Sequence, residues 1–312
     1  MPASPNKLFA GVDVTRTSMR AAVVAPDNTV VAKRESAFQP DSFTDDLAAL
    51  VSSLRETGEI ERVGLAIPGL VNRDTDRVLV STGLPSFVRA DLHDDLKKAT
   101  GSQLELENDA NAAAYAEYKL GVARDVQDFF YIHIGDSVGG AFILHGKLWT
   151  GASGCAGEVG HTTINPDGNQ CECGNIGCLE TMASGPNIVR RARERLNRDS
   201  TSSLSRLATT DDFTAEDLAR EATNGDDFSI MMIERTGRYI GTAVAGIINL
   251  ISPARIVLGG AIVEAGDLIL NSIIEEAGKR SFLQCFDSTK IVTAALGVDG
   301  VAIGAALLAR DA

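Results

Sequence analysis

The sequence of 312 residues lacks any apolar run that approaches the ~20 residues a helix needs to cross a bilayer. Its start, Met1 to Lys7, lacks the charged-then-apolar pattern of a secretory leader. Basic residues are also in deficit, since 29 Lys and Arg against 42 Asp and Glu give a net charge of −13. A net negative charge of this size repels the phosphate backbone of nucleic acids. We therefore expect a cytoplasmic protein that binds no membrane and, by this chain alone, no nucleic acid.

Cysteine is scarce, and its number is odd. Five cysteines cannot all pair, and a chain of this length forms a core without disulfides. This usage favours a reducing compartment with thiols or a metal site over a disulfide framework. The composition, 44% hydrophobic and 23% charged, is that of a globular protein. At ~150 residues per domain, the length predicts two domains.

A pattern of three short β-type runs separated by turn signals occurs twice, and each set predicts an antiparallel meander. The runs are residues 8–14, 19–25 and 29–33, and then 129–134, 139–144 and 147–149. Further elements follow each meander. We expect helices at 41–57, 91–100, 110–120, 187–197, 214–223, 227–251, 267–279 and 300–309, and strands at 62–67, 103–107, 255–258 and 290–294. Two such units in tandem predict an α/β protein of two similar lobes with a cleft between them.

The strongest local signal is one histidine and three cysteines within eighteen residues of a glycine-rich segment. They are His161, Cys171, Cys173 and Cys178. Three thiolates and an imidazole match a closed tetrahedral zinc site, which would hold in place a loop with little apolar content. The alternative is a set of free thiols in a loop. Cys155 and Cys285 fall outside this spacing and are interpreted as ordinary thiols.

A second signal, Glu107-Asn108-Asp109-Ala110-Asn111, lies where a strand ends and a helix begins. Polar side chains at the carboxyl ends of strands in α/β sheets meet ligands. A carboxylate there can accept the proton of a substrate hydroxyl. The alternative is simple capping of the helix by Asn108 or Asp109, which is worth ~1 kcal/mol.

A third signal is the glycine-rich segment 151–161, whose glycines allow the backbone to approach a ligand closely. Glu158 and His161 lie in it, and Glu180 follows the last cysteine of the candidate zinc loop. Two carboxylates and an imidazole together suit a polyhydroxylated ligand whose hydroxyl groups each need a partner.

These segments together resemble the ROK family (repressors, open reading frames and sugar kinases). The resemblance is carried by Gly157–His161, by Cys171–Glu180 and by Glu107–Asn111, and it extends from Leu8 to Ala309. It implies the actin-like, ribonuclease H-like fold, with two lobes and a central cleft. The smaller lobe would comprise residues 1–123 and 299–312, and the larger lobe, which carries the zinc loop, would comprise 124–298.

The resemblance also implies roles for individual residues. The hexose would be bound by Asn108, Asp109, Glu158, His161 and Glu180, with Asp109 as the general base. Structural zinc would be held by His161, Cys171, Cys173 and Cys178. MgATP would lie near Asp13, Thr17, Gly135, Gly139 and Gly140, and near a turn at Gly259 and Gly260 that resembles the family's adenosine-binding turn. From spacing alone, Gly259 and Gly260 equally fit a tight strand-to-helix turn.

Both phosphate loops depart from the family pattern. The first usually reads Asp-x-Gly-Gly-Thr-Lys and here reads Asp13-Val14-Thr15-Arg16-Thr17-Ser18. The second usually reads Gly-Thr-Gly-x-Gly-Gly-Gly and here reads Gly135-Asp136-Ser137-Val138-Gly139-Gly140-Ala141. Glycines in such loops let backbone N–H groups reach phosphate oxygens. The departures therefore indicate either a weakened nucleotide site or a site in which Arg16 has become a phosphate ligand.

Two functions follow from the resemblance. The first is an ATP-dependent, glucokinase-like kinase acting on a hexose or amino-hexose. The second is a non-catalytic sugar sensor that has lost nucleotide binding and lacks the family's DNA-binding domain. Gly83 replaces the asparagine that many family kinases carry before Leu-Pro, which weakens any transfer of glucose specificity. We also expect a homodimer or homotetramer, as is common in the family.

Overall fold

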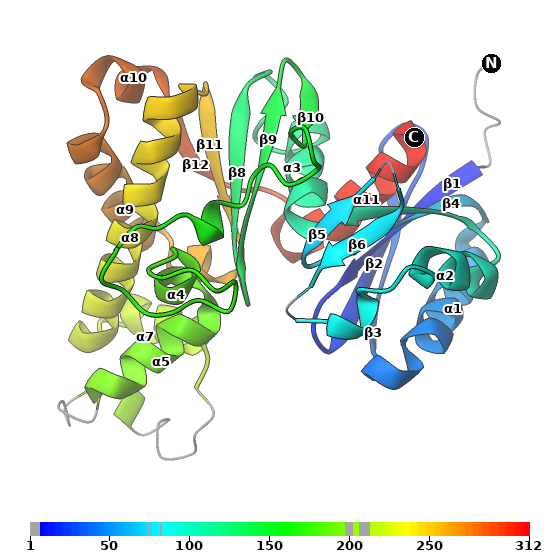
Figure 1. Ribbon diagram of the computed structural model, residues 1–312, viewed down its shortest axis with the longest axis horizontal. Helices are drawn as coiled ribbons and strands as arrows, with labels where there is room; N and C mark the ends of the chain where they lie inside the picture. The colour runs from blue at the N-terminus through cyan, green and yellow to red at the C-terminus, as the bar shows by residue number, and fades with distance from the viewer. Residues whose placement is uncertain (1–6, 74, 82, 197–201, 206–212) are drawn as a thin grey trace. The chain divides into compact units, whose positions relative to one another are not determined.

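The computed structural model describes residues 7–73, 75–81, 83–196, 202–205 and 213–312 (Figure 1). Two predictions fall on residues outside this description. One concerns the start of the chain before Lys7, and the other concerns the last residue of the helix expected at 187–197. The chain forms two compact units. The first comprises Met1–Asp125, Ala141–Ala156 and Ala295–Ala312, and the second comprises Val126–Gly140 and Gly157–Ala294. The lobe boundaries inferred from the sequence stay a prediction.

The first unit contains a five-stranded mixed sheet in the order β3-β2-β1-β4-β7. β1 pairs antiparallel with β2 and parallel with β4, and β4 pairs parallel with β7. The carboxyl ends of β1, β4 and β7 therefore lie at one edge of the sheet. The strands are β1 (Lys7–Val14), β2 (Ser18–Val24), β3 (Val30–Ala37), β4 (Glu59–Ile67) and β7 (Gln103–Asn108).

Helices cover both faces of this sheet, because alternate residues of a strand point to opposite faces. On β2, Ala21 and Val23 belong to the same core cluster as Leu47 of α1. The next residues along, Ala22 and Val24, pack instead with Ala302 of α11. This is why β2 is apolar on both sides. The helices of this unit are α1 (Phe43–Leu54), α2 (Leu92–Thr100), α3 (Asp109–Lys119) and α11 (Gly300–Asp311).

The final helix, α11, packs at backbone distance against α3. A Cβ atom at Gly304 would lie 1.7 Å from the carbonyl oxygen of Ala112, a separation that no side chain tolerates. Ala302, Ala305 and Ala306 of α11 are buried, and their backbone lies against Gly11 of β1, where a Cβ would be 2.0 Å from the carbonyl oxygen of Ala302. Packing this close brings the two helix backbones into van der Waals contact and is possible only with glycine at 304.

Glu117, a buried residue of α3, fixes two loops near the points where the chain leaves and re-enters the first unit. Its Oε2 accepts a hydrogen bond from the backbone N–H of Val122 at 2.8 Å. Its Oε1 accepts from the N–H groups of Ala295 and Leu296 at 2.8 and 2.9 Å. Three charge-assisted bonds offset the cost of burying this carboxylate.

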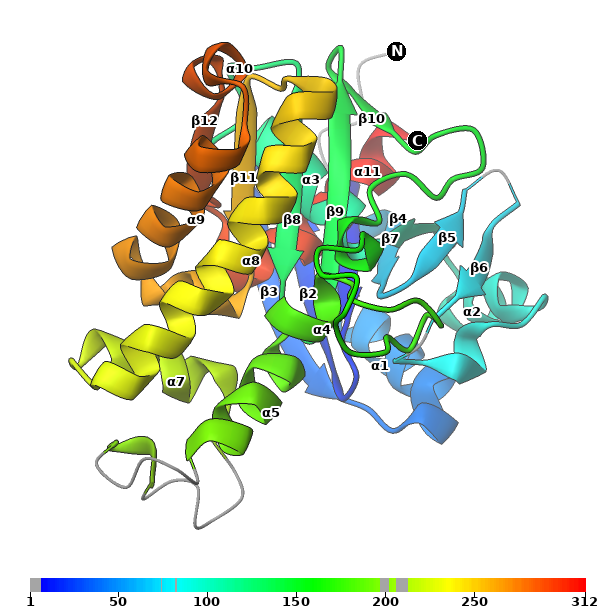
Figure 2. The ribbon, with the colours of Figure 1, turned by 60° about the vertical axis from the view of Figure 1, so that its left-hand side comes forward.

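The second sheet has the order β10-β9-β8-β11-β12, and β11 pairs parallel with both β8 and β12. The two views show α8 and α9 side by side along the β11 part of this sheet (Figures 1 and 2). The strands are β8 (Phe129–Ile134), β9 (Val138–Leu144), β10 (Lys147–Trp149), β11 (Arg255–Gly259) and β12 (Lys290–Thr293), and the longer helices are α5 (Gly185–Leu196), α7 (Ala215–Thr223), α8 (Asp227–Ile251) and α9 (Asp267–Arg280).

The predicted α/β class and both meanders are confirmed, but short elements were missed. The hairpin of β5 (Leu70–Asn72) and β6 (Arg77–Val80) has strands too brief to show a period. The short helices α4 (Glu180–Ala183) and α10 (Leu283–Ser288) were missed for the same reason. The third strand of the first meander runs to Ala37, four residues beyond the prediction, as an exposed strand at the edge of the sheet. Within the described residues, no helix is both long and apolar enough to span a membrane.

Replacing Gly304 with alanine should lower the free energy of unfolding by about 2 kcal/mol or more, because the methyl group would push α11 away from α3. Gly246 of α8 is the matched control, since a Cβ there meets nothing within 4 Å. Gly246→Ala should raise the free energy of unfolding by about 0.5–1 kcal/mol through helix propensity. Urea unfolding of both variants tests this, and equal effects at the two positions would contradict the packing account.

Candidate functional site

The junction between β7 and α3 holds Asn108 and Asp109 in defined positions. Asn108 has extended backbone angles and is the N-cap of α3, since its Oδ1 accepts from the N–H of Asn111 at 3.0 Å. Its Nδ2 donates to the carbonyl oxygen of Gly69 at 2.8 Å. Asp109 follows as the first helical residue, half-buried, and its Oδ1 accepts from the N–H of Ala110 at 2.8 Å. Helix capping and a ligand-binding role for Asp109 are therefore compatible, because Asn108 is the residue that caps the helix.

Glu107 lies beneath this junction and was missed as a site residue. Its side chain is 4% exposed, and Oε1 accepts from the N–H of Asn108 at 2.8 Å and from Nδ2 of Asn111 at 2.9 Å. Its Oε2 lies 3.3 Å from Nε of Arg73. Burial raises the pKa of Glu107, while Arg73 and the two amides oppose that rise. Glu107 thus fixes the backbone and side chain on either side of Asp109.

Asp13 supplies a second carboxylate in the first unit. It lies near the end of β1, paired across the sheet with Arg20, and it is buried. Burial, reinforced by the negative charge of Asp109, raises the pKa of Asp13 from 3.8 to about 7, and Arg20 acts in the opposite direction. Two carboxylates that repel each other form a site that favours a proton or a cation.

The glycines expected near the nucleotide lie on three segments of the second unit. The N–H of Gly135 donates to the carbonyl oxygen of Ser137 at 3.0 Å and so closes the turn between β8 and β9. Thr17 lies in the first unit, exposed in the loop between β1 and β2. The remaining expected residues are Gly139 and Gly140 on β9, Gly259 at the end of β11, and Gly260 in the turn that follows.

Gly260 is explained by the fold itself. Its φ is +97°, and a Cβ atom there would lie 2.1 Å from the carbonyl oxygen of Ile134. A tight turn from β11 into the short helix η5 (Ala261–Ala265) therefore requires glycine at this position. Its presence carries no independent sign of adenosine binding.

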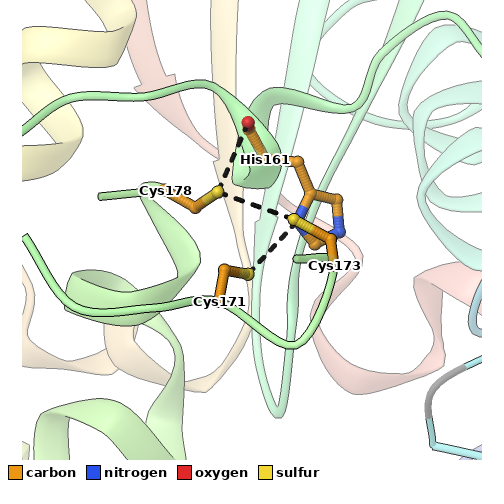
Figure 3. A group of neighbouring side chains, drawn as sticks. All are labelled: His161, Cys171, Cys173 and Cys178. Atoms are coloured by element: carbon orange, nitrogen blue, oxygen red, sulfur yellow. Dashed lines mark hydrogen bonds between the residues drawn. The ribbon is translucent and has the colours of Figure 1, made fainter. Parts of the chain in front are cut away.

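The four zinc-type residues lie together in the second unit (Figure 3). Their ligand atoms are all within 4.8 Å of one another. Sγ of Cys171 lies 3.6 Å from Nδ1 of His161, and Sγ of Cys173 lies 3.7 Å from Sγ of Cys178. Ligands ~2.0–2.3 Å from one tetrahedral zinc ion are ~3.3–3.8 Å apart, and these two separations match that range.

The chemistry of the donors also suits a divalent cation. Burial raises the pKa of the Cys178 thiol to about 12. The backbone N–H of Asn175 lowers the pKa of Cys173. A bound dication deprotonates coordinating thiols and outweighs such burial costs.

Glu158, His161 and Glu180 lie on two segments of the second unit that pack against the start of β9. His161 ends the short helix η4 (Val159–His161), and Glu158 directly precedes it. The N–H of Val138 donates to Oε2 of Glu180 at 3.1 Å. The carbonyl oxygen of Val138 lies against Gly160, where a Cβ would be only 2.0 Å away. His161 is itself one of the four zinc-type residues, and Glu158 and Glu180 lie within three residues of His161 and Cys178 along the chain. The first unit carries Asp13, Asn108 and Asp109.

Comparison with known proteins identifies the family of this chain. The family model described as the ROK family matches residues 9–312. A glucokinase of Thermotoga maritima is 29% identical, with 98% of each chain covered. The solved structure of a ROK family glucokinase from Streptomyces griseus, in complex with glucose and AMPPNP, has a TM-score of 0.88 at 29% identity and covers 98% of this chain and 100% of that one.

A regulator is similar to this chain to almost the same degree. The structure of a ROK family transcriptional regulator, a homologue of the Escherichia coli MLC protein, has a TM-score of 0.86 at 29% identity. It covers 98% of this chain and 78% of the regulator. The structural neighbours include ROK sugar kinases, which have the actin-like ATPase fold, and this confirms the fold class predicted from the sequence.

We expect the purified protein to contain about one zinc ion per chain, because four ligands close a tetrahedral site. Cys173→Ser should lower both the zinc content and the affinity for sugar, since the loop holds His161 beside Glu180. Cys285→Ser, on α10, is the matched control and should leave both unchanged. Metal analysis by mass spectrometry and calorimetry with glucose measure the two quantities. Wild-type zinc content in Cys173→Ser would refute the assignment.

The raised pKa of Asp13 predicts a pH-dependent stability. Because the folded-state pKa lies above 3.8, the carboxyl group stabilises the fold fully below pH ~4, and this contribution is lost as pH rises through 7. Asparagine cannot ionise. The free energy of unfolding of Asp13→Asn should therefore rise by about 2–3 kcal/mol relative to that of wild type as the pH goes from 5 to 8. Asp45→Asn, at an exposed position of α1, is the control. A constant difference between Asp13→Asn and wild type over this range would contradict the interpretation.

Proposed function

Since this chain belongs to the ROK family, we propose that it is an ATP-dependent hexose kinase of the glucokinase type. The observation that carries the proposal is the position of Asp109, at the N-terminus of α3, with Asn108 beside it bound to the carbonyl oxygen of Gly69. A carboxylate in this position can accept the proton of a sugar hydroxyl. The glucokinase from Thermotoga maritima and the glucose-bound structure from Streptomyces griseus support this assignment.

The binding roles are proposed as follows. Asn108, Asp109, Glu158, His161 and Glu180 hydrogen-bond the hydroxyl groups of a hexose or amino-hexose. MgATP lies near Asp13, Thr17, Gly135, Gly139 and Gly140, with Gly259 and Gly260 near the adenosine. The zinc-type cluster is structural, since four protein ligands leave no open position for a substrate. A reaction that consumes ATP and a loop that depends on reduced thiols are consistent with a cytoplasmic protein.

In the proposed reaction, Asp109 takes the proton from one sugar hydroxyl while the oxygen attacks the γ-phosphorus of ATP. The bond between that phosphorus and the β,γ-bridging oxygen breaks, and ADP leaves. A magnesium ion bound with the nucleotide would neutralise the charge that develops on the phosphoryl oxygens. The chain itself contributes mainly position, because phosphoryl transfer asks for alignment and charge neutralisation more than for covalent chemistry.

A sugar sensor without turnover is the second candidate. Two observations favour it: the substitutions at Thr15, Arg16, Asp136 and Ser137 in the phosphate loops, and the similarity to a transcriptional regulator. ADP release measured with a panel of hexoses, beside calorimetric binding of the same sugars, separates the two functions. Hexose-dependent ADP release supports the kinase, and binding without ADP release supports the sensor.

We expect Asp109→Asn to retain most sugar affinity, because an amide still hydrogen-bonds hydroxyl groups. Its turnover should fall by ~10²–10⁴-fold, because an amide cannot accept the proton. Asp94→Asn, at an exposed carboxylate of α2 in the same unit, should leave both quantities unchanged. Steady-state ADP release and calorimetry with the sugar provide the measurement. Turnover of Asp109→Asn within twofold of wild type would rule out the role of general base.

A further inference from the structure

The loop between β1 and β2 satisfies its backbone donors with its own side chain. Oγ1 of Thr15 accepts from the N–H of Ser18 at 3.0 Å and from the N–H of Thr17 at 3.4 Å. The N–H of Thr15 donates to the carbonyl oxygen of Ser18 at 2.9 Å, which closes the turn. A phosphoryl group at this loop would therefore find these three N–H groups already occupied.

Arg16 remains as a donor in this loop. Among the described residues, none forms a hydrogen bond or an ion pair with its guanidinium. The side chain lies over Gly83, where a Cβ atom would be 3.4 Å from Nε, 3.6 Å from Cγ and 3.9 Å from Cζ of Arg16. A Cβ atom at position 83 would therefore touch Arg16 at ordinary van der Waals distance, and only a longer side chain would compete with the guanidinium for space.

Gly83 lies on a segment that is connected to the candidate sugar-binding residues. Oγ of Ser81, two residues earlier, donates to the carbonyl oxygen of Pro68 at 2.7 Å. The next carbonyl oxygen along the chain, that of Gly69, accepts from Nδ2 of Asn108 at 2.8 Å. Two hydrogen bonds and a short stretch of chain therefore connect the segment that carries Gly83 to Asn108, the residue that caps α3.

The first unit carries two carboxylates, Asp13 and Asp109, that would repel a bound phosphoryl group. Asp13, three residues before Arg16, interacts with Asp109, and the arginine that acts on Asp13 is Arg20. Arg16 is left to serve another partner. Asp13 and Asp109 both repel anions, so a phosphoryl group bound beside them needs a positive side chain. The guanidinium of Arg16 offers paired donors that match two phosphoryl oxygens.

We propose that Arg16, seated over Gly83, is the phosphoryl-binding residue of the first unit and takes over the role that backbone N–H groups play in an open loop. The ligand is a terminal phosphoryl group, from either a nucleoside triphosphate or a sugar phosphate ester. The proposal rests on the proposed function in placing that group beside Asp109. Its test measures binding alone and so does not depend on turnover.

The experiment measures calorimetric dissociation constants of wild type and variants for three probes: AMPPNP with magnesium, glucose 6-phosphate, and glucose. Arg16→Gln should weaken binding of a phosphoryl ligand by about 10- to 100-fold, as expected for loss of a bidentate charge-assisted pair. Glucose affinity should change less than about twofold. Arg34→Gln, at an exposed arginine of β3 in the same unit, makes the same change in net charge and should change none of the three.

Two further variants keep the proposal falsifiable. Arg16→Lys should restore part of the affinity, because it keeps the charge but loses the paired donors. Gly83→Asn should weaken phosphoryl binding while leaving Arg16 in the chain, because its side chain would occupy the space under the guanidinium. A loss confined to AMPPNP assigns the group to the nucleotide, and a loss confined to glucose 6-phosphate assigns it to the sugar ester.

Either loss supports the proposal, whether or not the wild type releases ADP. The proposal is overturned if Arg16→Gln binds both phosphoryl probes as tightly as Arg34→Gln does. It is also overturned if wild type binds neither probe. A wild type that binds phosphoryl ligands through Arg16 but shows no turnover would instead contradict the kinase assignment alone.

Discussion

The position of the proposed base depends on one buried carboxylate, that of Glu107. Removing a carboxylate from water costs several kcal/mol unless hydrogen bonds and a counter-charge replace the lost hydration. Here the N–H of Asn108, the amide of Asn111 and the guanidinium of Arg73 surround it. These partners come from the strand end, the helix and the β5–β6 hairpin, so their contacts with Glu107 hold all three relative to one another. Two of them are hydrogen bonds to Oε1, and the third is an ion pair between Oε2 and Arg73. Asp109 and Asn108 then have their orientation set before any ligand binds.

The second unit solves the same problem with different chemistry. Its ligand-type residues lie on a loop with little apolar content, so hydrophobic burial cannot hold it. The loop is held instead by the cluster of four zinc-type side chains and by the hydrogen bond between Glu180 and Val138. Each unit thus presents its polar residues on a rigid support, one built around a buried carboxylate and the other around thiols and an imidazole. Sugar recognition by several hydroxyl contacts requires such fixed donors and acceptors.

Local features of the fold and site could be predicted from the sequence, and long-range ones could not. The strand-to-helix junction at Asn108 and the cysteine spacing depend on neighbouring residues, and both are found where they were expected. The contact between Arg73 and Glu107 spans 34 positions, and that between Arg16 and Gly83 spans 67. No periodicity or spacing reports such pairs. Gly260 shows a different limit: the turn itself requires glycine there, so the residue alone does not distinguish a binding motif from a structural turn.

The central claim is that this protein transfers a phosphoryl group to a hexose, and that its altered phosphate loops still work. The most direct measurement is ³¹P nuclear magnetic resonance of the zinc-loaded protein incubated with MgATP and one hexose at a time. The account predicts that, with at least one hexose, the γ-phosphate signal declines as signals of ADP and a sugar phosphate monoester rise together. An unchanged ATP spectrum with every hexose that the protein binds would contradict it.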